Sequence, residues 1–193
     1  SWNGTCWTET TDVNTARRYG WAAGTKALAI YTGGYTSTAV TNTEQWNGSA
    51  WTAVATLSTA KRNFGGSGQL YTSAIVAGGK NSTGVLAASE SWNGTAWTET
   101  ADLNDSRENL TVTGTTNTNA LVAGGESPGA TANTETWNGT SWSEVANLNT
   151  ARYSMGGAGS NTATFAFGGT PGSGFSATTE QWSTTQPIEA WAT

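Results

Sequence analysis

Short apolar runs alternate with polar, glycine-containing turns along the whole chain. Four of the runs end in a glycine pair, and they read ALAIYTGG, SAIVAGG, ALVAGG and TFAFGG. These segments are short, and they lack the 3.6-residue apolar period of an amphipathic helix. Because short apolar runs bounded by polar turns are typical of strands, the pattern predicts an all-β chain.

The same residue types return in the same order every 44 to 46 positions. Each unit begins with two tryptophans five residues apart, of which the first are Trp2, Trp46, Trp92, Trp137 and Trp182 and the second are Trp7, Trp51, Trp97 and Trp142. A basic residue and a single glycine follow, then the glycine pair, then a glutamate two positions before the next tryptophan pair. Self-similarity at such a period indicates a repeat architecture, and residues 1–193 are predicted to form a single domain.

Each repeat predicts four short strands, named a to d here. Strand a runs from the basic residue towards the single glycine, and strand b is the apolar run before the glycine pair. Strand c carries the glutamate and the first tryptophan, and strand d carries the second tryptophan. An Asn-Gly dipeptide between c and d favours a tight hairpin, because both residues tolerate a positive φ.

A four-stranded unit of about 45 residues cannot bury both of its faces alone, so the units are expected to stack around an axis as a β-propeller. The strand count predicts four blades of four antiparallel strands, over 14–56, 57–102, 103–147 and 148–185. The last unit has no Asn-Gly and no regular strand d, since it continues as STTQPIEAWAT. We therefore expect the N-terminal strand, within residues 1–13, to join the last blade and close the ring. Trp2 and Trp182 would then compete for the same strand-c position of the last blade, and only one of them can occupy it. The alternative is that further repeats precede Ser1.

Composition excludes several functional classes. The net charge is −5 and only eight residues are Lys or Arg, which argues against a nucleic-acid partner. No apolar run approaches the roughly 20 residues needed to span a bilayer, so no membrane insertion is expected. The chain has no histidine, and therefore no His base, Ser-His-Asp triad or His-ligated metal site, and it has no Walker-type or calcium loop. We expect no enzyme activity, no metal and no cofactor.

The combined columns resemble the kelch repeat: a basic residue before strand a, Gly-Gly after strand b, an aromatic residue in strand c and a tryptophan in strand d. The resemblance extends to about residue 182 and implies a kelch-like propeller. Two features depart from kelch, because strand c has Trp-Asn-Gly in place of Tyr and a longer turn, and four blades are fewer than kelch propellers usually have. Some kelch propellers are copper oxidases, but the chain lacks the histidines of that site. Units of the form WNGTxWTE followed by LNTAR also resemble repeats in predicted proteins of marine phages and bacteria, which implies a virion or microbial-surface setting.

The basic column and the glutamate column each supply one charge per repeat. The basic residues are Arg17, Lys61, Arg107 and Arg152, and the glutamates are Glu44, Glu90, Glu135 and Glu180. Because unpaired buried charges are costly, we expect structural pairs between the two columns. The alternative is a ring of positive charge at the mouth of the axis that attracts an anion.

Residues that break the repeat are the better candidates for ligand binding, because scaffold symmetry does not explain them. The b–c loops differ in every repeat and are expected on the same face as the d–a turns, here called the loop face. The candidate ligand-binding residues are Arg18, Tyr19, Trp21, Tyr35, Lys80, Glu126 and Phe175. The repeated tryptophans could stack on sugar rings, but large apolar groups at fixed repeat positions usually pack one blade on the next.

Together these features predict a non-catalytic binding module that presents its loops to a glycan or protein receptor. The expected setting is extracellular or virion-associated, in a phage tail fibre or a microbial surface adhesin. The alternative is a structural spacer or assembly subunit without a small-molecule ligand. The sequence is compatible with a homo-oligomer or a larger fibre assembly.

Overall fold

The computed structural model describes residues 1–184 and 190–192, and this part of the chain contains strands and turns but no helix. Sixteen strands form four antiparallel sheets, and in each sheet four consecutive strands are neighbours. The first sheet consists of β1 (Trp21–Gly24), β2 (Ala29–Thr32), β3 (Thr43–Trp46) and β4 (Trp51–Ala53). The second consists of β5 (Gly65–Leu70), β6 (Ser73–Ala77), β7 (Ser89–Trp92) and β8 (Trp97–Glu99). The third consists of β9 (Thr111–Thr116), β10 (Asn119–Ala123), β11 (Thr134–Trp137) and β12 (Trp142–Val145). The fourth consists of β13 (Gly156–Gly159), β14 (Ala163–Phe167), β15 (Thr179–Ser183) and β16 (Ala190–Ala192).

The turn between strands c and d is stabilised by its asparagine side chain. In the first sheet Trp46 and Trp51 are paired across β3 and β4, and residues 47–50 form the turn between them. Asn47 Oδ1 accepts hydrogen bonds from the backbone N–H groups of Ser49 (3.0 Å) and Ala50 (2.9 Å). Gly48 has a φ of 97°, which a side chain would strain, whereas Asn47 does not have a positive φ. The predicted hairpin is confirmed, although only the glycine uses the left-handed region.

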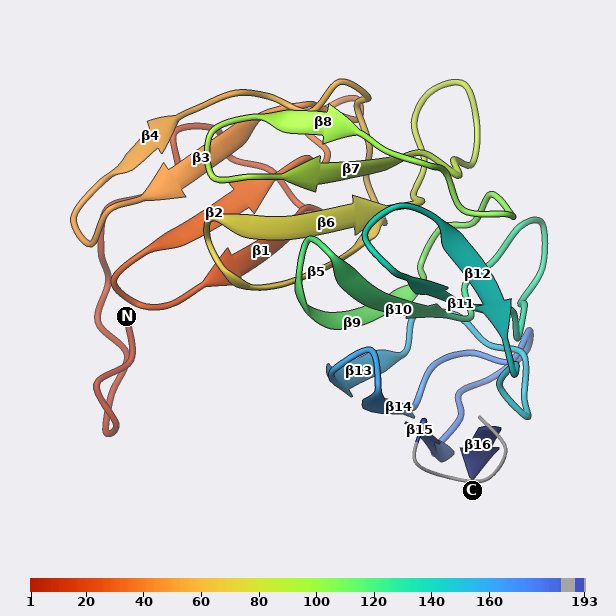
Figure 1. The fold of residues 1–193 in the computed structure, drawn as a ribbon. Helices are drawn as coiled ribbons and strands as arrows, with labels where there is room; N and C mark the ends of the chain where they lie inside the picture. Colours follow the sequence, from red (N-terminus) through yellow and green to blue (C-terminus); the bar gives the residue numbers. More distant parts are fainter. Residues whose placement is uncertain (185–189, 193) are drawn as a thin grey trace.

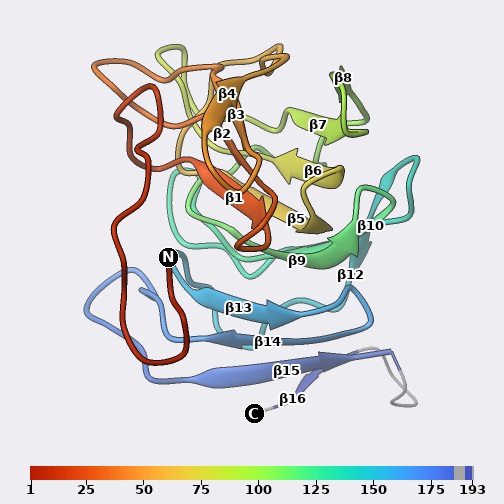
Figure 2. The same cartoon turned by 90° about the vertical axis from the view of Figure 1, so that its left-hand side faces the viewer.

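The four sheets follow one another around a common axis (Figures 1 and 2). Their first strands, β1, β5, β9 and β13, lie innermost and together line a narrow channel of about 190 Å³. The later strands of each sheet extend outward from this axis, so the arrangement is propeller-like (Figure 1). Within the described residues the ring is not closed, because the first and the fourth sheets stand at the two ends of the series without packing closely on each other.

Three apolar cores lie between consecutive sheets, and each is built from the same repeat positions. In the core between the first two sheets, Ile30 of β2 packs against Val76 of β6 and against Trp92 and Trp97. The equivalent cores lie between the second and third sheets and between the third and fourth. We call the face of a sheet that meets the next sheet its leading face, and the opposite face its trailing face. The strand-c and strand-d tryptophans lie on trailing faces.

The predicted closure by the N-terminal strand is wrong for the described structure. The fourth strand of the last sheet is β16, in which Trp191 pairs with Trp182 of β15. Trp182 thus occupies the strand-c column and is fully buried, whereas Trp2 pairs only with Trp7 in a separate N-terminal hairpin. Figure 1 shows this hairpin beside the first sheet, far from the C-terminus. The prediction failed because β16 follows Trp182 without the Asn-Gly turn and with a longer spacing than the other d strands.

Candidate functional site

The structure brings together each basic residue of the repeat and the glutamate of the same sheet. Arg17 pairs with Glu44 and Arg107 pairs with Glu135. Lys61 Nζ lies 3.2 Å from Glu90 Oε1, and Arg152 Nη2 lies 2.9 Å from Glu180 Oε1. All eight side chains have at most 2% exposure. These charges are neutralised inside the scaffold, so they do not form an anion-attracting ring.

Each glutamate of these pairs also holds the start of its repeat in place. The second carboxylate oxygen accepts a backbone N–H from the segment before strand a: Asn14 (2.6 Å), Ser58 (2.7 Å), Asn104 (2.9 Å) and Asn149 (2.7 Å). The basic partners donate to backbone carbonyls, as Arg152 does to Thr178 (2.8 Å) and Lys61 does to Ala88 (3.0 Å). Burial lowers the pKa of Lys61, and Glu90 beside it opposes that shift. One ion pair per repeat therefore ties strand c to the chain that precedes strand a and to the b–c loop.

Glu44 makes this arrangement sensitive to acid. Burial alone would raise the pKa of Glu44, but the hydrogen bonds from Arg17 and Asn14 outweigh it and lower the pKa below the ordinary value of 4.5. The stabilisation from this carboxylate is therefore fully present above pH 4.5 and is lost as the pH falls through the lowered folded-state pKa. We expect the stability difference between the parent and Glu44→Gln to shrink as the pH falls from about 6 to about 3. Urea unfolding across this range measures the difference; one that stays constant or grows in acid would contradict the assignment.

A second group of residues surrounds the mouth of the axis on the loop face. Four residues with positive φ, one from each repeat, stand there: Tyr19 (61°), Asn63 (55°), Asn109 (53°) and Ser154 (53°). Backbone hydrogen bonds join them in series, from Asn63 N to Tyr19 O (3.2 Å), from Asn109 N to Asn63 O (2.8 Å) and from Ser154 N to Asn109 O (2.8 Å). With the residue that follows each, they line a pocket of about 200 Å³. The scaffold thus fixes four non-equivalent side chains around one small opening.

The b–c loops are attached to this mouth by a repeated backbone bridge. In the four sheets the bridges join Arg18 to Tyr35, Arg62 to Lys80, Glu108 to Glu126 and Tyr153 to Thr170. Because each bridge is formed by a pair of backbone hydrogen bonds, the loop side chains are held at defined positions next to the mouth. This confirms that the first residues of the b–c loops and the d–a turns share one face.

Cations and aromatic rings gather on one side of the mouth, a group that we call the arginine–tyrosine cluster: Arg18, Tyr19, Tyr35 and Arg62. The guanidinium carbon of Arg62 lies 4.7 Å from the centre of the Tyr35 ring, and that of Arg18 lies 5.5 Å from the same ring. Arg18 also lies 4.9 Å from the Tyr19 ring. Within the described residues neither arginine forms an ion pair, so both keep donors for a ligand.

The other side of the mouth is acidic and already hydrogen-bonded. Lys80 Nζ lies 2.9 Å from Glu108 Oε1, and Asn63 Nδ2 donates to Glu108 Oε2 at 2.9 Å. Asn109 Nδ2 donates to Glu126 Oε1 at 2.7 Å. These contacts occupy the carboxylates and fix the amide side chains. Around the mouth, Arg18 and Arg62 are therefore the cations that no described carboxylate pairs with.

Five of the seven candidate ligand-binding residues therefore lie around the mouth, and two do not. Trp21 begins β1 and lies against Gly66 of the second sheet, where a Cβ would meet the indole ring at 2.5 Å. Its side chain thus fills space between two inner strands. Phe175 is 97% exposed in the loop before β15 and is not among the residues that line the mouth. Sequence reasoning missed Arg62 and Asn63, although they follow Lys61 as Arg18 and Tyr19 follow Arg17.

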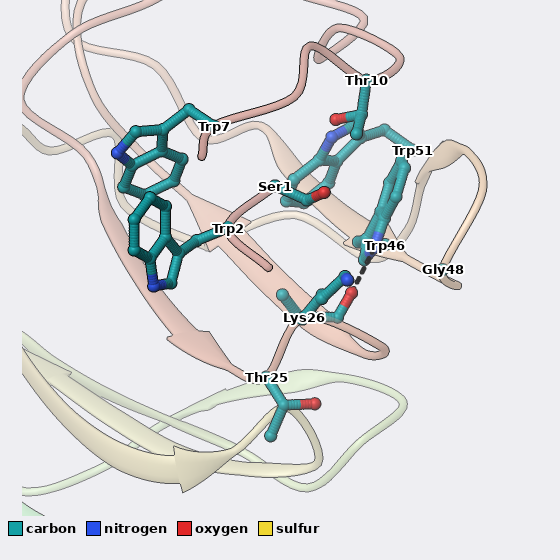
Figure 3. A pocket seen from close by; sticks show the side chains of 10 residues that line it. Ser1, Trp2, Trp7, Thr10, Thr25, Lys26, Trp46, Gly48 and Trp51 are labelled. Atoms are coloured by element: carbon teal, nitrogen blue, oxygen red, sulfur yellow. Dashed lines mark hydrogen bonds between the residues drawn. The ribbon is translucent and has the colours of Figure 1, made fainter. Parts of the chain in front are cut away.

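A separate apolar pocket of about 530 Å³ lies on the trailing face of the first sheet, and we call it the tryptophan pocket (Figure 3). It is lined by Trp46 and Trp51 of the sheet and by Trp2 and Trp7 of the N-terminal hairpin. Trp2 and Trp7 are tilted by 44° with ring centres 5.7 Å apart, and Trp46 and Trp51 have nearly the same geometry. Sequence reasoning assigned the repeated tryptophans to the core, which holds for Trp92, Trp97, Trp137 and Trp142 but not for the pair on this face.

Comparison with known proteins gives no family assignment, since no protein-family model and no curated protein sequence matches the chain. Among the described residues, no group of three or more cysteine, aspartate or glutamate side chains is placed to hold a metal ion. A search of the same residues for a long apolar helix able to cross a bilayer found none. The candidate site is thus defined by geometry alone: a small mouth beside two arginines that lie next to tyrosine rings and form no ion pair with any described residue.

Proposed function

We propose that the protein is a non-catalytic binding module whose loop face takes up a glycan receptor that carries an acidic group. The observation that supports this most is the arginine–tyrosine cluster, in which two guanidinium groups without carboxylate partners flank one tyrosine ring. Guanidinium groups bind carboxylates through paired hydrogen bonds, and the cation–π contacts with Tyr35 hold the two guanidinium groups near each other. The pocket of about 200 Å³ beside the cluster, which Tyr19 lines, is the size of a single sugar unit rather than of an extended chain.

The setting that we propose is extracellular or virion-associated, as a kelch-like receptor-binding propeller of a phage tail fibre or a microbial adhesin. Its support is the resemblance of the repeat columns to kelch, together with the low charge and the many hydroxyl and amide side chains. A rigid repeat scaffold with variable loops is a common way to present a binding surface. The backbone bridges at the mouth agree with this, because they attach the variable loops to the rigid scaffold.

Arg62→Ala and Tyr35→Ala are each expected to weaken glycan binding at least about tenfold, which corresponds to about 1.4 kcal/mol. Each variant removes one member of the Arg62–Tyr35 contact and leaves the buried ion pairs intact. The measurement is binding to an array of neutral and acidic glycans, followed by calorimetric titration of the best ligand. Acidic glycans should bind and their neutral counterparts should not.

The matched control is Lys26→Ala, because Lys26 is an exposed cation in the turn between β1 and β2, outside the loop face. Equal losses in Lys26→Ala and Arg62→Ala would mean that net charge alone drives binding, and would remove the site. A blank array, with specific capture of a surface protein that Arg62→Ala abolishes, would favour a protein receptor over a glycan.

The second candidate function is an assembly subunit, and a specific observation favours it. The two end sheets carry aromatic side chains on faces that no other sheet covers, among them Phe165 and Trp51. Large exposed apolar patches commonly mark interaction sites. This function uses different residues from those of the loop face, so the two are separable by mutation.

A further inference from the structure

The two end sheets expose opposite faces, and the burial pattern along strand b shows which. In the middle sheets, Ala74–Ala77 of β6 and Ala120–Ala123 of β10 are buried on both faces. In β2 of the first sheet only Ile30 and Thr32, on the leading face, are buried. In β14 of the fourth sheet only Thr164 and Ala166, on the trailing face, are buried. The chain therefore has one leading face and one trailing face that no other sheet covers, and the N-terminal hairpin lies across part of the trailing one.

The uncovered leading face of the fourth sheet carries the bulkiest residues of its column. Phe165 is 47% exposed and Phe167 is 44% exposed. The equivalent positions of the second sheet are Ile75 and Ala77, which are fully buried against the third sheet. Terminal units of repeat proteins normally present a polar outer face to water. This end instead has the apolar character of an interface.

The trailing face of the first sheet, which no other sheet covers, is also apolar. Trp46 and Trp51 occupy the positions that Trp92 and Trp97 occupy in the core between the first and second sheets. Tyr31 lies on the same face of β2. Trp2 and Trp7 of the N-terminal hairpin stand across the tryptophan pocket from Trp46 and Trp51, and Trp7 is 80% exposed (Figure 3). In the internal cores, a leading face of β-branched or apolar side chains covers these tryptophan columns.

The interface between the first and second sheets also contains a polar contact, and the repeat equivalents of its two residues are unused at the ends. Trp97 Nε1 donates to Thr43 Oγ1 of the preceding sheet at 3.1 Å in a buried position. The repeat equivalent of Trp97 in the first sheet is Trp51, and the equivalent of Thr43 in the fourth sheet is Thr179. Among the described residues the structure gives no side-chain hydrogen bond for Trp51 Nε1 or for Thr179 Oγ1. An interface like that between the first two sheets would pair them, whereas the equivalent Trp142 Nε1 and Ser89 Oγ between the second and third sheets have no partner among the described residues.

We propose that the leading face of the fourth sheet binds the trailing face of the first sheet in a second copy of this chain. The contact repeats the apolar packing of the three internal interfaces, with Phe165 and Phe167 against the Trp46–Trp51 pair. Trp51 would donate to Thr179 as Trp97 donates to Thr43 between the first two sheets. Two copies related by a two-fold axis form two such contacts, which cover every open face. The occupant is a second copy because the complementary residues lie on the first sheet, which does not pack closely on the fourth sheet of its own chain.

The association is tested by light scattering of the purified chain across micromolar concentrations. The expected mass is about twice the 19.9 kDa of one chain. Phe165→Glu and Trp51→Glu should each weaken self-association at least tenfold, because each places a charge within both contacts of the dimer. Leu70→Glu is the matched control, since Leu70 is 56% exposed near the turn between β5 and β6 and lies on neither face. Circular dichroism confirms that each variant is folded.

Mixing the two variants distinguishes this contact from other modes of association. Phe165→Glu keeps an intact first-sheet face and Trp51→Glu keeps an intact fourth-sheet face, so their mixture should recover one contact and form a heterodimer. If instead the same face of each chain formed the dimer, mixing the two variants would not restore association in this way. A monomeric parent chain, unchanged association in both variants, or a mixture that stays monomeric would overturn the proposal. A monomer whose tryptophan fluorescence responds to cellohexaose would assign the tryptophan pocket to a sugar and overturn it as well.

Discussion

Replacing Arg107 by methionine is expected to lower the free energy of unfolding by about 3–5 kcal/mol. Arg107 and Glu135 are both essentially buried, and removing the guanidinium leaves the carboxylate without its cation in the interior. Glu135 would keep its hydrogen bonds from the backbone and side chain of Asn104, which offset only part of this cost. Urea denaturation followed by tryptophan fluorescence measures the change.

Two further variants make this result interpretable. Lys80→Met breaks the Lys80–Glu108 pair, in which the lysine is 38% exposed and the glutamate 7%, and should cost less than Arg107→Met because solvent screens the lysine. The double variant Arg107→Met with Glu135→Leu removes both buried charges and should recover much of the loss. If Arg107→Met costs no more than Lys80→Met, the ion pair in each repeat is not a structural requirement.

Replacing Trp137 by alanine is expected to cost about 3–5 kcal/mol, whereas Trp7→Ala should cost less than about 0.5 kcal/mol. The two tryptophans belong to ring pairs of similar geometry, with centres 5.3 Å and 5.7 Å apart. Trp137, however, lies in the core between the second and third sheets, and its indole N–H donates to Asn117 O at 3.0 Å. Trp7 is 80% exposed.

Comparing the two variants shows whether the tryptophan pair stabilises the protein only where it lies between two sheets. Similar denaturation midpoints for Trp137→Ala and the parent would show that the pair does not hold the sheets together. A large loss in Trp7→Ala would show that the N-terminal hairpin is part of the cooperative core and would argue against its being a peripheral element.

The repeat unit was predictable from the sequence because every strand carries a marker that recurs. The glycine pair ends strand b, the glutamate marks strand c, and the Asn-Gly turn separates c from d, so the four sheets follow directly. The charge pairs were predictable for a related reason, since a buried column of basic residues needs one counter-charge per unit. Lys61 fits that column as well as the arginines do.

The ends of the chain were not predictable from the same markers. The segment that contains β16 has no Asn-Gly, and Trp191 follows Trp182 at a spacing that no other repeat shows. The partial exposure of Trp46 and Trp51 could not be predicted either, because the burial of a repeated column depends on whether another sheet covers it. The residue pattern within one repeat does not show whether a second sheet packs on it.

The candidate site was predictable only in part. Non-repeated residues next to the basic column, such as Arg18 and Tyr19, pointed to the loop face. The closeness of Arg62 to Tyr35 was not visible, because these residues belong to different repeats and meet only where two sheets converge at the axis. Trp21 breaks the repeat for a structural reason, since it packs over Gly66 of the neighbouring sheet.

Each sheet is completed by strands of its own repeat, and β16 is the last strand of the fourth sheet. The most direct measurement is amide hydrogen exchange of the full chain and of a chain that lacks residues 1–8. The structure predicts that amides of Gln181 and Ser183, which pair with Ala192 and Ala190, exchange at the same slow rate in both chains. Loss of protection at β15 when residues 1–8 are removed would show that the N-terminal segment completes the fourth sheet, and would contradict this arrangement.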